Sequence, residues 1–299
     1  MTHLKKGKYS QKELSDLLEI DRRETREVLN TIEAAGYILQ SQKVGNEQLY
    51  FIGRQTVSGE THYISGAKNK ATTLKWGLVG DTHLNSWHHN KEALDSFYAD
   101  AKKAGIQKYI QVGDVQEGNG KMYREQMLEL KLFGFDKVAD HVVKEYPKEG
   151  NLETILIGGN HDDSWVKQEG ADIVKAIASE RKDMKYLGMY VADIVEDGVR
   201  FRMLHPEGGG TYARSYTIQK YIRNLMPEDR PDVIIYGHLH QFLHMNEQGV
   251  EVIGLPAFQS ATGWLARKGI QSQVGGVIAD FDIEKGKLQG VNLRKIDYT

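Results

Sequence analysis

WGLVGDTH, at residues 76–83, is the stretch from which the fold is predicted, because an apolar run ends there in glycine and is followed at once by polar side chains that can bind metal. The same pattern recurs in YIQVGDVQE (109–117), ILIGGNHD (155–162) and VIIYGHLH (233–240), and FRMLH (201–205) ends directly in histidine. Short apolar runs bounded by glycine predict buried strands. Because ligands collect at the carboxyl ends of strands in α/β sheets, the five polar sets are expected to meet at one rim.

Helical patterns alternate with these strands. Apolar spacing predicts helices over residues 91–103, 122–143, 172–179 and 213–225. Alternation of strands and helices is typical of an α/β domain, which we expect to occupy residues 73–299.

The first 55 residues have the pattern of a separate small domain. A Ser-x-x-Glu capping box precedes a first predicted helix at residues 10–18, and an Asp-x-x-Glu pattern precedes a second at 22–35, which Gly36 ends. Apolar segments on either side of a Gly-Asn turn at 45–46 predict a β-hairpin. Two helices and a hairpin resemble a winged helix-turn-helix module, and residues 56–72 are expected to form a linker or an extended surface segment.

Composition excludes several classes of protein. The chain has 299 residues, which suggests two domains, and its formal net charge of −2 gives no overall attraction to nucleic acid or membrane. Cysteine is absent, so disulfides, thiolate metal sites and cysteine nucleophiles are excluded. The apolar runs are too short to cross a bilayer, and we expect a cytoplasmic protein.

The donors at the strand ends fit one kind of chemistry. Carboxylate, amide and imidazole ligands without thiolate suit Mn, Fe or Zn. The set is large enough for two ions that share one carboxylate, and two ions roughly 3.5 to 4 Å apart stabilise the attacking and leaving oxygens of phosphoryl transfer. The sequence therefore predicts metal-assisted phosphoester hydrolysis.

The ordered set Asp-x-His, Gly-Asp, Gly-Asn-His-Asp, His and Gly-His-x-His resembles the calcineurin-like metallophosphoesterase superfamily, over roughly residues 74–260. The resemblance implies a two-sheet sandwich flanked by helices and two divalent ions, for which Mn²⁺ is the first candidate and Fe or Zn the alternatives. It also implies residue roles: one ion held by Asp81, His83 and His240, the other by Asn160, His205 and His238, with Asp114 as the bridge and His161 as the general acid.

One departure from the family pattern concerns the position three beyond the bridging aspartate. The phosphatase branch usually has aspartate and then arginine there, whereas this chain has Glu117 and Gly118. Glu117 is expected to orient His161 from outside the ligand set, and Arg124 is either a substitute for the missing arginine or a solvated side chain. His88 and His89 are either substrate contacts or plain loop residues.

The leading hypothesis is a phosphodiesterase or nuclease that acts on nucleic acid through a hydroxide shared by the two ions, with His161 as the general acid. Three arginines at the start of the second helix, Arg22, Arg23 and Arg26, favour DNA contact by the small domain. Residues 1–53, however, hold eight Lys/Arg and eight Asp/Glu, so a protein partner stays open.

Two alternatives remain. One is a phosphomonoesterase or a phosphodiesterase for small nucleotides. The other is a DNA-binding regulator whose metal domain has no catalytic activity.

Overall fold

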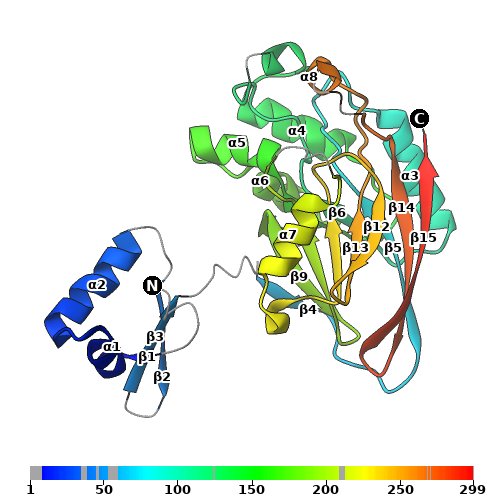
Figure 1. Cartoon of the computed structure of the whole chain (residues 1–299). Coiled ribbons are helices and arrows are strands. Elements are labelled where there is room, and N and C mark those ends of the chain that lie inside the picture. Colours follow the sequence, from blue (N-terminus) through cyan, green and yellow to red (C-terminus); the bar gives the residue numbers. More distant parts are fainter. Residues whose placement is uncertain are drawn as a thin grey trace. The chain divides into compact units, whose positions relative to one another are not determined.

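The computed structural model describes residues 9–34, 39–44, 47–52, 60–123, 125–208, 213–267, 269 and 271–298. The chain divides into two compact units, Met1–Val57 and Ser58–Thr299 (Figure 1). No helix in the described ranges has the length and apolar character that crossing a bilayer requires.

The small unit contains two helices and a three-stranded antiparallel sheet of order β1-β3-β2. Its elements are β1 (Tyr9–Ser10), α1 (Gln11–Leu18), α2 (Arg22–Ala34), β2 (Leu39–Val44) and β3 (Glu47–Ile52). This is the predicted order of two helices and a hairpin, although Gly36 and the turn at 45–46 lie outside the described residues. The assignment to the winged helix-turn-helix class stays a prediction.

Both predicted capping patterns of the small unit are present. Ser10 Oγ accepts from Glu13 N at 3.2 Å, and Glu13 Oε2 accepts from Ser10 N at 2.7 Å. Asp21 Oδ1 likewise accepts from the amides of the first turn of α2. Leu14 and Leu29 form the buried centre of this unit.

Two six-stranded sheets face each other in the large unit, with orders β15-β14-β5-β6-β7-β8 and β12-β13-β11-β10-β9-β4. The strands of this unit are β4 (Thr61–Tyr63), β5 (Thr72–Val79), β6 (Lys108–Val112), β7 (Thr154–Gly158), β8 (Met184–Met189), β9 (Val191–Glu196), β10 (Val199–Leu204), β11 (Val233–Tyr236), β12 (Leu243–Glu247), β13 (Val250–Gly254), β14 (Gly275–Glu284) and β15 (Lys287–Asp297). Between the sheets the rings of Trp76, Phe201 and Phe281 pack with centroids 4.4 to 5.2 Å apart.

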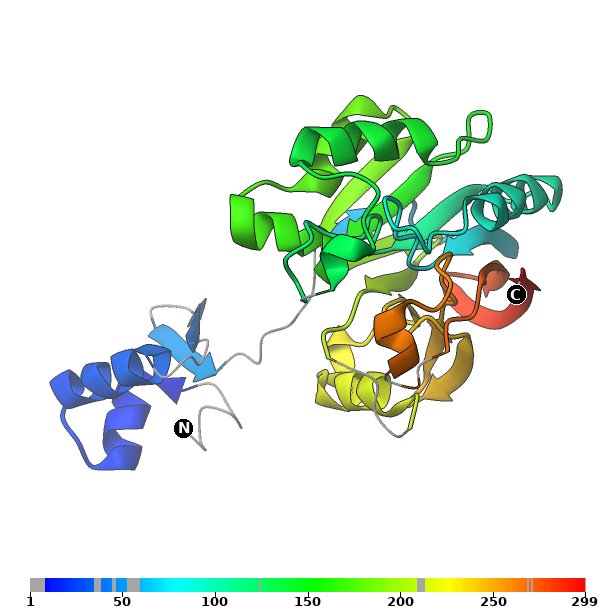
Figure 2. The same ribbon diagram turned by 90° about the horizontal axis from the view of Figure 1, so that it is seen from above.

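Helices cover the outer faces of both sheets, so the predicted two-sheet sandwich flanked by helices is confirmed (Figure 2). α3, α4 and α6 pack on the first sheet, and α7 packs on the second. The helices are α3 (Lys91–Lys103), α4 (Phe135–Glu145), α5 (Asn160–Glu169), α6 (Ile173–Glu180), α7 (Tyr216–Asn224) and α8 (Gly263–Arg267), with short 3-10 turns at Gln126–Leu128 and Pro227–Asp229.

The predicted helix over 122–143 is wrong in its first half. Among the described residues of this range, only those from Phe135 onward are α-helical (Phe135–Glu145), and Gly134, with a φ of 96°, precedes them. Lys131 N donates to Asn85 O at 2.8 Å, and the Asn85 side chain binds both backbone groups of Leu132. These bonds hold the segment before α4 against the loop after β5, so its backbone groups are not available to helical turns.

Residues 56–72 were expected to be a linker or an extended surface segment; the described part, residues 60–72, belongs to the large unit. β4 pairs in parallel with β9 at the edge of its sheet. The carboxylate of Asp197, 1% exposed, accepts from Ser65, Lys68 and Thr72 at 2.7 to 2.9 Å. These contacts fix the segment, so the natural boundary of the unit is Ser58.

A chain that begins at Ser58 is therefore expected to match the full chain in the thermal unfolding of its large unit, whereas one that begins at Ala71 should unfold several degrees lower. The shorter chain leaves β9 as a bare edge and removes two partners of a buried carboxylate, and each lost bond to a charged group costs about 1.5–3 kcal/mol. Circular dichroism melting measures the difference. Lys68→Ala in the full chain isolates the ion pair, and equal melting of both truncated chains would contradict the boundary.

Candidate metal centre

Five strand ends bring the predicted residues together. β5, β6 and β7 are adjacent parallel strands of one sheet, and β10 and β11 are adjacent parallel strands of the other. Their carboxyl ends are followed by the side chains expected to bind metal: Asp81, His83, Asp114, Asn160, His205, His238 and His240.

The backbone at this rim adopts a conformation that non-glycine residues rarely take. His83, Asp114, His238 and His240 have φ values between 47° and 76°. Such left-handed residues cost about 1–3 kcal/mol each and persist only where the surroundings hold them. All four residues belong to the two groups of donors at this rim, His83 and His240 to one and Asp114 and His238 to the other.

Glycine before the motif residues prevents steric conflict. A Cβ on Gly159 would collide with Asp114 Oδ1, and a Cβ on Gly237 would collide with Asp81 Oδ1. The glycines therefore allow the backbone of one strand end to approach the carboxylate of another.

The first group of donors consists of Asp81, His83 and His240. His240 Nε2 lies 3.1 Å from Asp81 Oδ2 and 3.2 Å from His83 Nε2. All three side chains are buried, and one donor atom of each lies within 4.8 Å of the others. This is the set that the resemblance implies for one ion.

The second group consists of Asp114, His205 and His238, with Asn160 beside it. His205 Nε2 lies 3.2 Å from Asp114 Oδ2 and 2.9 Å from Asn160 Oδ1. His205 Nδ1 donates to the Val112 carbonyl at 2.8 Å, which fixes the ring so that Nε2 faces the oxygens.

Asp114 lies between the two groups. Its Oδ2 is 3.2 Å from His205 Nε2 and 3.9 Å from His83 Nε2, and its Oδ1 accepts from the backbone of His161 at 2.8 Å. The carboxylate thus occupies the position expected of a bridge.

His161 and Glu117 form a third group with His83. The expected contact between His161 and the Glu117 carboxylate differs in detail. His161 Nδ1 donates to the Glu117 backbone carbonyl at 2.6 Å, while the carboxylate is 3.5 Å from that nitrogen and 3.1 Å from His83 Nδ1. The peptide of Glu117 therefore orients His161, and its carboxylate lies closer to His83.

The sequence did not predict the two residues that bind the Glu117 carboxylate, Gln259 and Tyr123, or Glu129, which binds Tyr123. Gln259 Nε2 donates to the Glu117 carboxylate at 2.5 Å, and Tyr123 OH donates to it at 3.2 Å while also contacting Glu129. Gln259 follows no recognisable motif, and Tyr123 and Glu129 fall in the segment mistaken for a helix, so the sequence carried no signal for them.

The charges of the centre are strongly coupled. Burial raises the pKa of Asp114, but the neighbouring His205 and His161 outweigh it and hold that pKa well below its ordinary value. Burial lowers the pKa of His205, but Asp114 outweighs burial and raises the pKa to about 10. Burial likewise opposes ionisation of Glu117, yet His83 and His161 lower its pKa to about 2. The centre thus contains buried carboxylates that need positive charge beside them.

The donor set fits divalent metal. His205 Nδ1 donates to the Val112 carbonyl, so its Nε2 faces the side-chain oxygens of Asn160 and Asp114. A proton on Nε2 lies between these two oxygens, where a metal cation would lie. Two imidazole nitrogens, His83 Nε2 and His240 Nε2, face each other at 3.2 Å, and at most one proton fits between them. Oxygen and nitrogen donors at such spacing suit Mn, Fe or Zn.

The remaining candidates take other positions. His89 donates to the Thr82 carbonyl at 2.6 Å, and burial lowers its pKa to about 4, so it supports the loop after β5. The His88 carbonyl accepts from Ser260 N at 2.9 Å. Arg124 lies outside the described residues.

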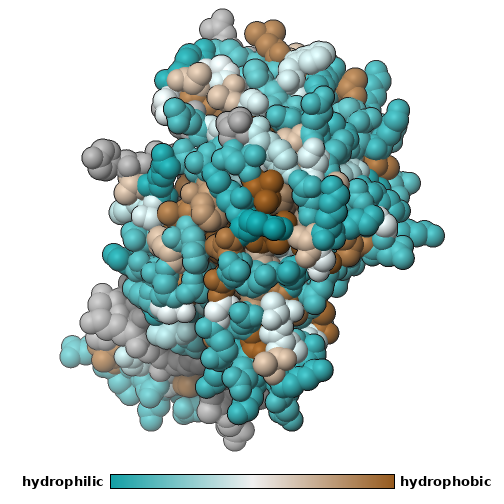
Figure 3. All heavy atoms as spheres, turned by 90° about the vertical axis from the view of Figure 1, so that its right-hand side faces the viewer, coloured by the Kyte–Doolittle hydropathy of each residue, from teal (hydrophilic) through white to brown (hydrophobic). Residues whose placement is uncertain are grey.

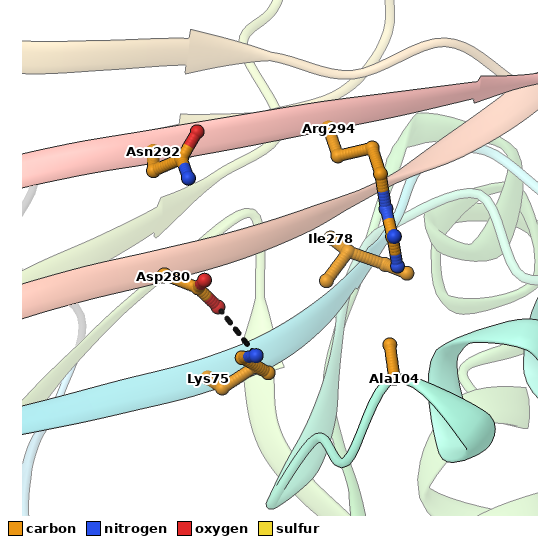
Figure 4. Close-up of a pocket in the computed structure, with 6 residues that line it drawn as sticks. All are labelled: Lys75, Ala104, Ile278, Asp280, Asn292 and Arg294. Atoms are coloured by element: carbon orange, nitrogen blue, oxygen red, sulfur yellow. Dashed lines mark ion pairs between the residues drawn. The ribbon is translucent and has the colours of Figure 1, made fainter.

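A cavity of about 190 Å³ lies elsewhere, on the first sheet beside the end of α3 (Figure 4). Lys75 Nζ is 3.5 Å from Asp280 Oδ1 there. None of the candidate metal or catalytic residues belongs to its lining, which is Lys75, Ala104, Ile278, Asp280, Asn292 and Arg294. The side of the molecule on which β15 lies is largely hydrophilic (Figure 3).

The fold and the donor cluster define an α/β sandwich protein with a candidate metal centre at its strand ends. Residues 74–255 match the calcineurin-like phosphoesterase superfamily domain. The chain belongs to this superfamily, as the resemblance in its motifs implied.

Solved structures with similar folds are distant in sequence. An archaeal phosphodiesterase is 16% identical, with a TM-score of 0.42 and coverage of 75% of this chain and 100% of that one. Vps29 from Entamoeba histolytica, complexed with Zn, is 13% identical (TM-score 0.39; 76% and 100% covered). A predicted phosphoesterase from Streptococcus pneumoniae TIGR4 is 8% identical (TM-score 0.38; 75% and 99% covered). No curated protein sequence matches the chain.

The position of Glu117 leads to a prediction about metal affinity. Glu117→Gln removes the negative charge beside His83 and should weaken Mn²⁺ binding about 10- to 100-fold, as loss of a group that orients a ligand typically does. Calorimetric titration with Mn²⁺ measures the affinity. Glu129→Gln changes the other end of the same network and should leave the affinity nearly unchanged. Equal affinities for wild type and Glu117→Gln would show that the carboxylate does not support His83.

Proposed function

We propose that this protein is a metal-dependent phosphodiesterase that acts on nucleic acid. The observation that supports the proposal most is the convergence of two donor groups, buried except for the half-buried His238, on either side of the Asp114 carboxylate. When bound, two divalent ions would polarise the phosphoester and lower the pKa of a water molecule. The residues that would hold them are Asp81, His83 and His240 for one, Asn160, His205 and His238 for the other, and Asp114 for both.

We infer that His161 moves a proton in the reaction. Because its Nδ1 proton is bound to the Glu117 carbonyl, only Nε2 is left to serve the departing oxygen. In the chain without metal, burial lowers the pKa of His161, but Asp114 and Glu117 outweigh burial and raise it. A protonated imidazole beside the centre fits a general acid.

The charge of the site favours a diester over a monoester. Gly118 follows Glu117 where the phosphatase branch has arginine, so this position offers no guanidinium to a phosphate. A phosphomonoester carries up to two negative charges and a diester only one, so a diester depends less on such a clamp. A monoesterase is therefore the second candidate.

The small unit favours nucleic acid as the substrate. Arg22, Arg23 and Arg26 belong to α2, and Arg23 is also within 3.4 Å of Glu27. A weak DNA-binding unit joined to a hydrolase raises the local concentration of its target. The chain that begins at Ser58 should bind duplex DNA more weakly and with a flatter salt dependence than the full chain, and equal binding would contradict this role.

Asp114→Asn tests the centre itself. The change removes a charge shared by both groups, so metal content and hydrolysis of bis-p-nitrophenyl phosphate with Mn²⁺ should fall together to near background. Asp163→Asn is the matched control, because Asp163 lies in α5 and binds Tyr190 and Lys167 rather than the donor groups. An Asp114→Asn variant that keeps two metals and near-normal turnover would contradict the bridge.

His161→Ala tests the general acid. A general acid contributes about 10²–10⁴-fold, and its contribution is largest for a poor leaving group. The variant should retain metal, cleave p-nitrophenyl esters moderately well and fail on alkyl esters. The measurement is the rate against the pKa of the leaving group: a steeper line for the variant is expected, and parallel lines would exclude His161 as the proton donor.

A further inference from the structure

An apolar surface lies on two loops beside the metal centre. Trp87, in the loop after β5, is 66% exposed, and Met127, Leu128 and Phe133, in the segment before α4, are 49% to 81% exposed. Single exposed apolar side chains are ordinary on protein surfaces, but several on adjoining loops form a surface suited to a ligand.

These two loops are fixed to each other. Trp87 N donates to the Glu129 carbonyl at 2.8 Å, Ser86 pairs with Leu130 in an antiparallel bridge, and Lys131 N donates to Asn85 O at 2.8 Å. The indole is therefore presented to solvent from a backbone that is already ordered, which lowers the entropic cost of binding through it.

The loops are also connected to the centre. Ser86 N donates to His83 O at 3.0 Å, which closes a turn whose ends are under 7 Å apart. Trp87 follows Ser86, and consecutive Cα atoms are about 3.8 Å apart, so the Trp87 Cα lies within roughly 11 Å of the His83 Cα. A strand with one phosphate at the metal centre can therefore place a neighbouring base on the indole.

The charge beside the indole indicates the class of ligand. Lys131 Nζ lies 5.8 Å from the centroid of the Trp87 ring. No carboxylate of the described residues forms an ion pair with this lysine, so its charge is available to an anion. A flat π-face next to a cation matches a base joined to a phosphate, whereas a purely apolar partner would desolvate the ammonium group.

We propose that Trp87 and Lys131 form a subsite that stacks an unpaired base of a single-stranded nucleic acid next to the phosphodiester to be cleaved. The inference rests on the proposed function and narrows its substrate class. In a duplex both faces of an interior base are covered by its neighbours, so the subsite selects single strands or ends.

Binding of a thymidylate hexamer to the full chain tests this subsite. The dissociation constant is measured by calorimetry with Mn²⁺ present and with phosphorothioate linkages in the hexamer, which resist hydrolysis, so that a phosphate can lie at the metal centre while the strand stays intact. Trp87→Ala should raise it about 5- to 100-fold, because loss of one stacking aromatic typically has that effect. Trp87→Phe should restore most of the binding, and Lys131→Ala should weaken binding and reduce its salt dependence.

Two controls separate stacking from other effects. Tyr63→Ala removes an aromatic side chain that is 79% exposed on the edge strand β4, and it should leave binding unchanged. A hexamer that lacks its bases should bind wild type and Trp87→Ala equally. The inference is overturned if Trp87→Ala and wild type bind the thymidylate hexamer with equal affinity. It is also overturned if Trp87→Ala weakens binding of the hexamer without bases as much as it weakens binding of the thymidylate hexamer. It is also overturned if Trp87→Ala alters only self-association in sedimentation, which would assign the surface to a second copy of the chain.

Failure of the subsite and failure of the proposed function give different results. If wild type hydrolyses methyl p-nitrophenyl phosphate with Mn²⁺ but binds the hexamer independently of Trp87, the phosphodiesterase proposal stands and the subsite is overturned. If Trp87 governs hexamer binding but no diester is cleaved with any divalent metal, the subsite stands and the proposed function fails.

Discussion

The arrangement of the large unit depends on the contacts of the buried Asp114. The backbone carbonyl of Asp114 accepts from the amides of Thr82 and His83 after β5, and the Oδ1 atom of its side chain accepts from the first turn of α5. Its Oδ2 faces His205 after β10, in the opposite sheet. Asp114 thus joins three strand ends of one sheet to the other sheet. Its negative charge requires that those strand ends carry hydrogen-bond donors or positive groups.

A buried carboxylate is stable only with positive charge or hydrogen bonds beside it. Histidine side chains supply part of that compensation. Burial lowers the pKa of His205, but the charge of Asp114 outweighs burial and raises the pKa to about 10. Metal ions would satisfy the same requirement in place of the proton. The left-handed backbone at His83, Asp114, His238 and His240 is tolerated because these contacts hold it.

Two different groups of Glu117 contact two different histidines of the centre. The Glu117 carbonyl fixes His161, and the Glu117 carboxylate lies against His83 with Gln259 and Tyr123 around it. The chain of contacts continues through Glu129 to Trp87. The segment before α4 therefore supports the centre and also carries the exposed side chains of Met127, Leu128 and Phe133.

The strand-end pattern, the superfamily and the residues that gather at the rim could be predicted from the sequence alone, because each of them depends on short stretches in which the spacing is local. The capping boxes of the small unit and helices α3 and α6 were predictable for the same reason. The tertiary structure was needed to show that the described residues 122–123 and 125–134 lie outside helix α4, that residues 60–72 belong to the large unit, and that Gln259 reaches Glu117 from 142 positions away. These outcomes depend on which distant backbone or side-chain partner satisfies a polar group, and such a partner has no signature in the local sequence.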